Sequence, residues 1–394
     1  MNNTDSFSPL TILEESHVSP PPATTVCQSL RLTFYDILWL GIPDPIHALF
    51  FYHFPITKTH FTETIVPNLK QSLSITLQHF FPFAGKLIIF PTRSRIPEIR
   101  YADGDLVDFT VAECDLDFND LTGNHPRNCD KFYHFIPVLG STAKESDHVT
   151  IPVFAVQVTL FPNHGISIGM TNHHSLCDAS SRFCFLKAWT AIAQTGSDDW
   201  FLANGTLPVY DRLVKYPNWM KVMPTTLRLN PLTKSINFKD FLDQLIRSRL
   251  DPPIPGAYFG NCVMPCASIA RTSILKEKEG FLTAARLIGE NLHKMLTDKD
   301  AFVKDLGPIE SLFPGGWPKM MMGVAGTPKL KFYDLDFGFG RPIKHETVSI
   351  DYNGSMSISA CRESNEDLEI GVCLSATEMD GFVGNFNRGL ESYI

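Results

Sequence analysis

A mixed α/β or α+β architecture is predicted by three stretches of the sequence. Residues 153–161 (VFAVQVTLF) alternate between two sets of side chains, which is the two-residue period of a β-strand. After Asp178, apolar residues recur at the spacing of a buried helix, namely Phe183, Leu186, Trp189 and Ile192. In the C-terminal third, strand patterns precede a last helical segment. Because both halves of the chain mix strands with helices, we predict an α/β (α+β) fold.

Nearer the N-terminus, a helix and a strand are predicted to follow one another. Residues 73–80 combine apolar and small polar side chains and are predicted to be helical. Pro82 ends this helix, because proline has no backbone N–H for the helical hydrogen bond. Residues 85–90 are then predicted to form a strand.

The middle of the chain predicts a β-hairpin that leads into a helix. The tetrapeptide Pro162–Gly165 (P-N-H-G) is a turn signal, so residues 166–174 are predicted to return beside the preceding strand. Asp178, Ser180 or Ser181 is expected to cap the following helix. The histidines of the stretch therefore lie where a strand ends, a frequent place for functional residues.

The C-terminal third is predicted to begin with strands. Within residues 329–339, Leu335, Phe337 and Phe339 alternate with polar or small residues, which indicates a strand. Residues 348–360 are predicted to form a hairpin about Asn353-Gly354, a strong turn signal. Residues 368–374 are predicted as another strand, and residues 377–393 as the closing helix.

Length and composition indicate a globular protein with few classes of partner. The chain has 394 residues, of which 44% are hydrophobic and 19% charged, and this length suggests two domains. A net charge of -8 argues against nucleic-acid binding. The most apolar stretches, such as residues 80–90, are about half as long as a membrane span requires. With nine cysteines, no C-x-x-C spacing and no signal-peptide pattern, we expect a cytoplasmic protein without a membrane partner.

The first motif that carries chemistry is T-N-H-H-S-L-C-D at residues 171–178, which allows three interpretations. His174 could be a core histidine with Asp178 as a helix cap. The cluster could bind a metal, although no H-E-x-x-H or C-x-x-C pattern supports this. His174 could also act as a general base on a hydroxyl group that a substrate supplies, since no G-x-S-x-G element provides an enzyme-borne serine. The motif alone does not decide between them, and Cys177 adds a thiol nucleophile as a further alternative.

A second motif, D-F-G-F-G, occupies residues 336–340. A D-F-G triplet is also found in protein kinases, but the glycine-rich loop, V-A-I-K and H-R-D elements of kinases are missing from the sequence. Taken alone, the motif indicates a strand edge at which two glycines let other backbone approach closely.

Together, the two motifs resemble the plant BAHD acyl-CoA-dependent acyltransferases, which carry H-x-x-x-D and D-F-G-W-G in this order. Other stretches resemble the branch that acylates anthocyanins and other phenolic glucosides: L-T-F-Y-D-I-L-W-L (32–40), L-Q-H-F-F-P-F-A-G-K-L (77–87) and Y-F-G-N-C (258–262). The resemblance extends from about residue 13 to the end of the chain.

The resemblance implies two chloramphenicol acetyltransferase-like domains, here residues 1–215 and 216–394, with the active site in a tunnel between them. It also implies an acyltransferase that moves a malonyl or hydroxycinnamoyl group from CoA to a hydroxyl of a flavonoid, anthocyanin or other phenolic glycoside. Acyl-CoA is then a co-substrate, no cofactor or metal is expected, and a monomer is the default state.

The resemblance also assigns roles to individual residues. His174 takes the proton of the acceptor hydroxyl, which attacks the thioester without an acyl-enzyme, while Asp178 orients the structure through a salt bridge for which Arg341 is a candidate partner. Tyr258 and Asn261 are expected to bind substrate. Arg182 is either an exposed helix arginine or a fork for a carboxylate such as that of a malonyl group. The second motif, with Asp336, Gly338 and Gly340, is expected to support the loop near the tunnel mouth.

Two departures from the family pattern stand out. Phe339 replaces the usual tryptophan of the second motif. Between about residues 216 and 246 the family has several tens more residues, including a strand and a helix of the second domain, so we expect a shortened second domain. The alternative function is therefore a shortened, inactive homologue that at most binds CoA or phenolic ligands.

Overall fold

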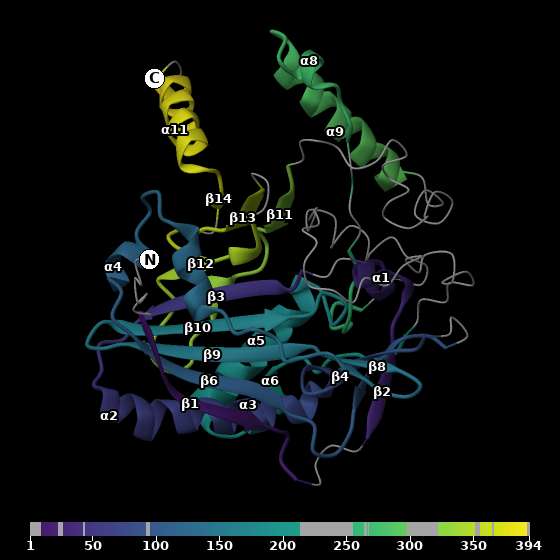
Figure 1. Ribbon diagram of the computed structural model, residues 1–394, viewed down its shortest axis with the longest axis vertical. Helices are drawn as coiled ribbons and strands as arrows, with labels where there is room; N and C mark the ends of the chain where they lie inside the picture. Colours follow the sequence, from purple (N-terminus) through teal and green to yellow (C-terminus); the bar gives the residue numbers. More distant parts are fainter. Residues whose placement is uncertain are drawn as a thin grey trace, which may run out of the picture.

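The structure is a computed structural model that describes residues 9–22, 27–41, 44–91, 95–212, 255–263, 266, 268–297, 322–350, 355–364 and 366–391 (Figure 1). Up to residue 212 the described elements are β1 (Leu10–Val18), β2 (Gln28–Arg31), α1 (Phe34–Ile37), η1 (Leu38–Gly41), β3 (Ile46–His53), α2 (Lys58–His60), η2 (Phe61–Ile65), α3 (Val66–His79), η3 (Phe81–Phe83), β4 (Lys86–Ile89), β5 (Glu98–Tyr101), β6 (Val107–Cys114), α4 (Phe118–Thr122), η4 (Cys129–Phe135), β7 (Ala143–Lys144), β8 (Val149–Pro152), β9 (Phe154–Phe161), β10 (Gly165–Asn172), α5 (Ala179–Thr195) and α6 (Asp199–Asn204). From residue 255 on they are α8 (Thr272–Leu275), α9 (Gly280–Thr297), β11 (Val324–Thr327), η7 (Phe332–Asp334), β12 (Lys344–Glu346), η8 (Val348–Ile350), β13 (Met356–Ala360), β14 (Leu368–Val372) and α11 (Ala376–Glu391).

The described strands form three sheets (Figure 1). The largest has the order β1-β6-β9-β10-β3-β12, in which only β6 and β9 run parallel to each other. A second sheet has the order β2-β5-β4-β8-β7, and a third the order β11-β13-β14. We call the part built on the first two sheets the first lobe. The third sheet with α8, α9 and α11 is the second lobe.

The predicted hairpin is confirmed as β9 and β10, which pair antiparallel. Every residue of both strands is buried, however, and not only one alternating face. Helices α3 and α5 contribute to the core on one face, and a smaller aromatic cluster with Phe118 and Phe135 covers the other. Gly169 permits this close cover, because a Cβ atom there would lie 1.8 Å from the carbonyl oxygen of Phe135.

The helices predicted near this hairpin are also confirmed. Helix α3 ends at His79, before Pro82, and α5 begins after Asp178, which is its N-cap. The returning strand is shorter than predicted, because β10 ends at Asn172 and His174 lies in the turn that follows. The two histidines therefore do not point to opposite faces of a strand as an extended backbone would dictate.

The second motif forms a loop, so the strand predicted over residues 329–339 is wrong. A 3-10 turn, η7, takes its place, and the alternating burial arises because the apolar side chains pack into the first lobe. The Tyr52 hydroxyl donates a hydrogen bond to the carbonyl oxygen of Leu335 at 3.0 Å, and Phe337 lies edge-on to Trp189. The loop thus ties the second half of the chain to the first lobe.

The carboxylate of Asp336 organises this loop. Its Oδ1 atom accepts hydrogen bonds from the backbone N–H groups of Gly338 and Gly340 at 2.7 and 2.9 Å. Both glycines have φ of +100°, a region that residues with a Cβ atom rarely adopt. The requirement for glycine at both positions therefore follows from the backbone conformation, and the expected supporting role of these three residues agrees with the geometry.

The first lobe also takes a strand from the second half of the sequence. Strand β12 pairs with β3 at the edge of the largest sheet, with Lys344 opposite Phe51. The chain therefore crosses back into the first lobe well after residue 216. The predicted domain boundary itself lies outside the described residues and stays a prediction.

In the second lobe, the predicted strand over residues 368–374 and the closing helix are confirmed as β14 and α11. The strand predicted as the first arm of the hairpin is wrong, because residues 348–350 form the 3-10 turn η8. The turn at Asn353-Gly354 lies outside the described residues. Among the described helices, none is long and apolar enough to cross a membrane.

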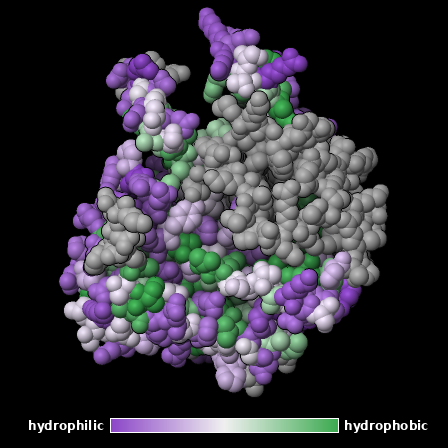
Figure 2. Space-filling model, viewed as in Figure 1, coloured by the Kyte–Doolittle hydropathy of each residue, from purple (hydrophilic) through white to green (hydrophobic). Residues whose placement is uncertain are grey.

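Helices α9 and α11 project from the body of the molecule, and Figure 2 shows them as separate protrusions. Both expose large apolar side chains: Phe281, Leu282 and Ile288 on α9, and Phe382, Phe386 and Leu390 on α11. Exposed apolar rows of this kind are typical of helices that normally pack against another element.

Replacing Asp336 tests the role of the second motif. Asp336→Ala removes the acceptor for two N–H groups, so we expect the free energy of unfolding to fall by about 1–2 kcal/mol in urea titrations. Asp334→Ala is the matched control, since Asp334 is an exposed partner of Arg341 and its loss should cost less than about 1 kcal/mol. Equal stability of the two variants would contradict the assignment.

Candidate active site

The turn that carries His174 is fixed at its C-terminal end by Asp178. Asp178 Oδ1 accepts a hydrogen bond from the backbone N–H of Ser181 at 2.9 Å, which caps helix α5. Its Oδ2 accepts another from the backbone N–H of Cys262 at 3.1 Å. The side chain is 2% exposed. Asp178 therefore joins the start of α5 to the Y-F-G-N-C stretch, which lies 84 residues away in sequence.

The partner predicted for Asp178 is not Arg341. The guanidinium of Arg341 pairs with the carboxylate of Asp334 and donates from Nε to the carbonyl oxygen of Tyr333 at 2.8 Å. Both members of the Arg341–Asp334 pair are largely exposed. Arg341 pairs with Asp334 because η7 folds the two residues beside each other, while Asp178 is buried at the start of α5.

Asn261 holds the same turn from another direction. Its Nδ2 donates to the carbonyl oxygen of His174 at 2.9 Å and to Asp36 Oδ1 at 3.1 Å, and its backbone N–H donates to Asp36 Oδ1 at 2.7 Å. Asp36 is fully buried and is also the N3 residue of a capping box with Thr33 at the start of α1. The segments that carry Asp36, His174 and Asn261 thus meet at the carboxamide of Asn261.

Tyr258 is held inside this network as well. Its hydroxyl accepts a hydrogen bond from Arg212 Nη1 at 2.6 Å, and Arg212 lies 3.6 Å from Asp36 Oδ2. Tyr258 and Asn261 are therefore both held by other protein groups, and substrate binding by either residue stays a prediction. Asn261 Oδ1 is the exception, since it is buried and finds no protein partner among the described residues.

The His174 side chain lies flat against the indole ring of Trp39. The two ring centroids are 3.7 Å apart and the ring planes differ by 3°. The residue is 1% exposed, and neither Nδ1 nor Nε2 has a hydrogen-bond partner among the described residues. Leaving buried polar atoms unpaired costs free energy, so both ring nitrogens remain able to bind a further partner.

His173 has a different environment from its neighbour. Its Nδ1 accepts a hydrogen bond from the backbone N–H of Ser175 at 3.1 Å, which fixes the ring against the turn. Burial lowers the pKa of His173 to about 4, so the ring is neutral at neutral pH. Because its Nδ1 already accepts this hydrogen bond, His173 contributes to the structure of the turn.

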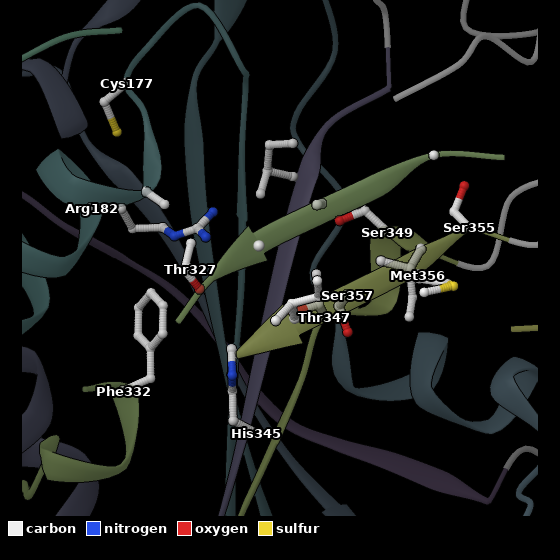
Figure 3. Close-up of a pocket in the computed structure, with 17 residues that line it drawn as sticks. Cys177, Arg182, Thr327, Phe332, His345, Thr347, Ser349, Ser355, Met356 and Ser357 are labelled. Atoms are coloured by element: carbon white, nitrogen blue, oxygen red, sulfur yellow. The ribbon is translucent and has the colours of Figure 1, made fainter. Parts of the chain in front are cut away.

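A cavity of about 50 Å³ lies between helix α5 and the second lobe (Figure 3). Arg182 reaches it from α5, and Figure 3 shows its guanidinium beside Thr327 at the end of β11. Hydroxyl groups from both lobes line the remaining wall: Thr347, Ser349, Ser355 and Ser357. Arg182 is 9% exposed and donates from Nη1 to Asn172 Oδ1 at 3.1 Å. His174 is not among the lining residues.

Arg182 affects the titration of two nearby histidines. Burial and the positive charge of Arg182 lower the pKa of His47 to about 4. Burial, Arg182 and Lys344 lower the pKa of His345 to about 3. Both rings are therefore neutral near pH 7, and the cavity keeps its positive charge on Arg182.

The remaining alternatives from the sequence receive less support. Burial raises the pKa of Cys177 well above that of an ordinary thiol, so it carries little thiolate and is a poor nucleophile. Within the part of the chain that the structure describes, no group of three or more His, Cys, Asp or Glu side chains is arranged to hold a metal ion.

The sequence motifs did not single out Trp39, Asp36, Arg212 or His345. Trp39 and Asp36 both lie in L-T-F-Y-D-I-L-W-L, a stretch that carried the family resemblance but no assigned role. A buried acidic residue three positions after a threonine is a recognisable capping signal. Trp39 stacks on His174, Asp36 binds Asn261 and Arg212 binds Tyr258, and all three contacts join residues far apart in sequence, which no local pattern records.

Comparison with known proteins places the chain in a family. The sequence model of the Transferase family matches residues 8–212 and 241–388. This chain belongs to the Transferase family. The predicted resemblance to BAHD acyltransferases is thereby confirmed.

Two curated relatives support the same membership. The chain is 46% identical to malonyl-coenzyme A:anthocyanin 3-O-glucoside-6''-O-malonyltransferase of Dahlia pinnata, with 99% of each chain covered. It is 36% identical to malonyl-coenzyme:anthocyanin 5-O-glucoside-6'''-O-malonyltransferase of Salvia splendens, with 96% of this chain and 95% of that protein covered. The acyltransferase class predicted for this family member is thus confirmed.

Solved structures confirm the predicted fold class. Vinorine synthase superposes with a TM-score of 0.62 and 20% identity, covering 94% of this chain and 96% of that chain. The F. graminearum TRI101 complex with ethyl coenzyme A gives a TM-score of 0.52 and 13% identity, covering 90% and 96%. At these identities the likeness establishes the two-domain fold alone.

This Transferase family member is shorter than its relatives. The comparison with the Dahlia protein extends over 466 positions, whereas the chain has 394 residues, so the relative carries several tens of residues without a counterpart here. The family match is interrupted between residues 212 and 241, close to the gap predicted from the sequence. That the shortening falls in the second domain stays a prediction.

The buried histidines predict a pH dependence of stability. Below about pH 6.5 an unfolded histidine binds a proton, whereas folded His345 stays neutral down to about pH 3. The unfolded state then binds more protons, so stability falls as the pH falls through this window. Between pH 4 and 6, we expect His345→Gln to lower by about one the number of protons that the chain takes up on unfolding. The slope of the unfolding free energy against pH then falls in proportion.

The control for this measurement is His164→Gln, because His164 is exposed in the turn between β9 and β10. Its slope should match that of the unmodified chain. A slope unchanged by His345→Gln would show that His345 titrates normally in the folded state.

Proposed function

We propose that this chain transfers a malonyl group from malonyl-CoA to a glucose hydroxyl of an anthocyanin or another phenolic glucoside. The observation that carries the proposal is the buried His174 ring, held by Trp39 and the Asn261–Asp36 network, with both ring nitrogens unpaired among the described residues. The names of the Dahlia and Salvia relatives supply the substrate class.

In the proposed reaction, a ring nitrogen of His174 accepts the proton of the acceptor hydroxyl. The oxygen attacks the thioester carbonyl of malonyl-CoA, the tetrahedral intermediate expels the CoA thiolate, and the imidazolium returns its proton to sulfur. A positioned base of this kind contributes roughly 10²–10⁴-fold to the rate. The remainder comes from holding both substrates in reach of each other in a channel between the lobes.

The indole of Trp39 supports this role in two ways. The parallel contact at 3.7 Å limits rotation of the imidazole, which keeps its nitrogens aimed in one direction. When the ring becomes an imidazolium, the negative face of the indole also stabilises the new charge. Asn261 fixes the backbone on which the ring is carried, while Asp178 fixes the turn at the start of α5.

Arg182 is proposed to recognise the free carboxylate of the malonyl group. A guanidinium forms charge-assisted, bidentate hydrogen bonds with a carboxylate, and burial strengthens such a contact. The hydroxyl-lined wall of the cavity offers further donors. A hydroxycinnamoyl group, the donor suggested by coumaroyltransferase relatives from Arabidopsis thaliana, has no carboxylate to place there.

The proposal includes acyl-CoA as a co-substrate, no resident cofactor and no nucleic-acid partner, in a cytoplasmic monomer. The nine cysteines, all of them thiols, fit a reducing compartment. The relatives do not favour the alternative of an inactive homologue. Release of CoA thiol from malonyl-CoA with a panel of phenolic glucosides tests the choice, and no release with any acceptor by folded protein would contradict the proposed function.

Replacement of the base gives a direct test. His174→Ala should lower kcat/KM by about 10²–10⁴-fold while the protein still folds, because only the proton acceptor is lost. His164→Ala is the control, since His164 is exposed. Thiol release with malonyl-CoA measures both, and an undiminished rate in His174→Ala would exclude the general-base role.

Replacement of the proposed carboxylate ligand tests donor choice. Arg182→Leu should lower kcat/KM for malonyl-CoA about 10–100-fold relative to acetyl-CoA, which lacks the carboxylate. Lys187→Leu is the matched control, because Lys187 is an exposed cation on the same helix. An equal loss with both donors would indicate that Arg182 has a structural role instead.

A further inference from the structure

Two cysteines from different lobes lie beside each other. Cys129 is the first residue of η4 in the first lobe, and Cys373 directly follows β14 in the second lobe. Their Sγ atoms are 3.8 Å apart, although 244 residues separate them in sequence. Both side chains are partly buried thiols. The structure therefore holds two sulfur atoms in contact across the lobes.

The same place is already bridged by polar side chains. Lys344 Nζ donates to Asn124 Oδ1 of the first lobe at 2.9 Å and also binds the carboxylate of Glu369 on β14. The Tyr333 hydroxyl donates to Glu369 Oε2 at 2.6 Å. Glu369 lies in β14, and Cys373 directly follows the last residue of this strand. The sulfur contact continues this row of contacts, which holds the two thiols close together.

The two thiols are also accessible. Both line a groove of about 1450 Å³ between the lobes, together with Arg127, Lys344 and residues of α11. By contrast, Cys114, Cys177 and Cys262 are buried, and burial raises the pKa of Cys114 and of Cys177. A small oxidant such as a glutathione disulfide can therefore reach Cys129 and Cys373 more readily than the core thiols.

We propose that Cys129 and Cys373 form a reversible disulfide that covalently joins the two lobes under oxidising conditions. One thiolate attacks glutathione disulfide and releases one glutathione, and the second cysteine then displaces the other glutathione from the mixed disulfide. Two S–H bonds are lost, one S–S bond forms, and glutathione disulfide is reduced to two glutathione molecules. The sulfur atoms approach from 3.8 Å to about 2.05 Å by side-chain rotation.

The bond would act on the cavity that contains Arg182. Strand β14 pairs with β13, and Met356, Ser357 and Ile358 of β13 line that cavity. A covalent link at the end of β14 therefore restrains the wall opposite Arg182. The inference does not depend on which acyl group the chain transfers, since it concerns the relative freedom of the lobes.

The test is peptide mapping of the full chain in glutathione buffers of increasing oxidised fraction. After remaining thiols are alkylated and the protein is digested without reductant, we expect a peptide pair linked through Cys129 and Cys373 that dithiothreitol removes. Cys129→Ser and Cys373→Ser should each lose the linked pair, whereas Cys27→Ser, which removes an exposed cysteine elsewhere, should retain it. The oxidised chain should melt a few degrees higher than the reduced chain.

A measurement on the unmodified chain guards against variants that fail to fold. Dibromobimane, which bridges neighbouring thiols, should link Cys129 to Cys373 in the reduced chain once the reductant has been removed. The proposal is overturned if both cysteines are alkylated to the same extent as Cys27 at every buffer composition, if they carry separate glutathiones without a link, or if Cys373 pairs with another cysteine.

Discussion

The hydrogen bonds of the Asn261 carboxamide are the constraint on which the rest of the site depends. One Nδ2 group donates to the carbonyl oxygen of His174 and to the buried carboxylate of Asp36, so three segments separated by tens to hundreds of residues are fixed at one point. A buried carboxylate is tolerated only when its oxygens accept hydrogen bonds. Those of Asp36 accept them from Thr33 and Asn261. Disturbing any member leaves a buried charge or carbonyl unpaired.

The polar side chains around Asn261 are held in two different ways. Asp178, Tyr258 and Asn261 direct their hydrogen bonds to other protein atoms, whereas the imidazole of His174 is held by ring stacking and by its backbone. Stacking constrains the plane of a ring without occupying its nitrogens. This division leaves both ring nitrogens of His174 without a partner among the described residues, while the surrounding groups are fixed by hydrogen bonds.

In the neighbouring cavity, positive charge is also confined to one group. His47 and His345 are kept neutral by burial and by the charge of Arg182, so that positive charge is concentrated on one guanidinium. The second lobe supplies most of the opposite wall through β11 and β13. The shape of this cavity consequently depends on a lobe whose helices α9 and α11 expose apolar side chains.

The sequence by itself determined the elements that depend on neighbours in the chain. The β9–β10 hairpin, the start of α5 within a few residues of Asp178 and the terminal helix follow from local periodicity and capping signals, and the two spaced motifs identified the family. Tertiary structure alone decided that residues 329–339 form a loop, that Arg341 pairs with Asp334, and that β12 joins the first sheet. It also decided that Trp39 stacks on His174, that Asn261 holds the turn and that Tyr258 binds Arg212. These features depend on contacts between residues far apart in the chain, whose energies no local pattern of residue types contains.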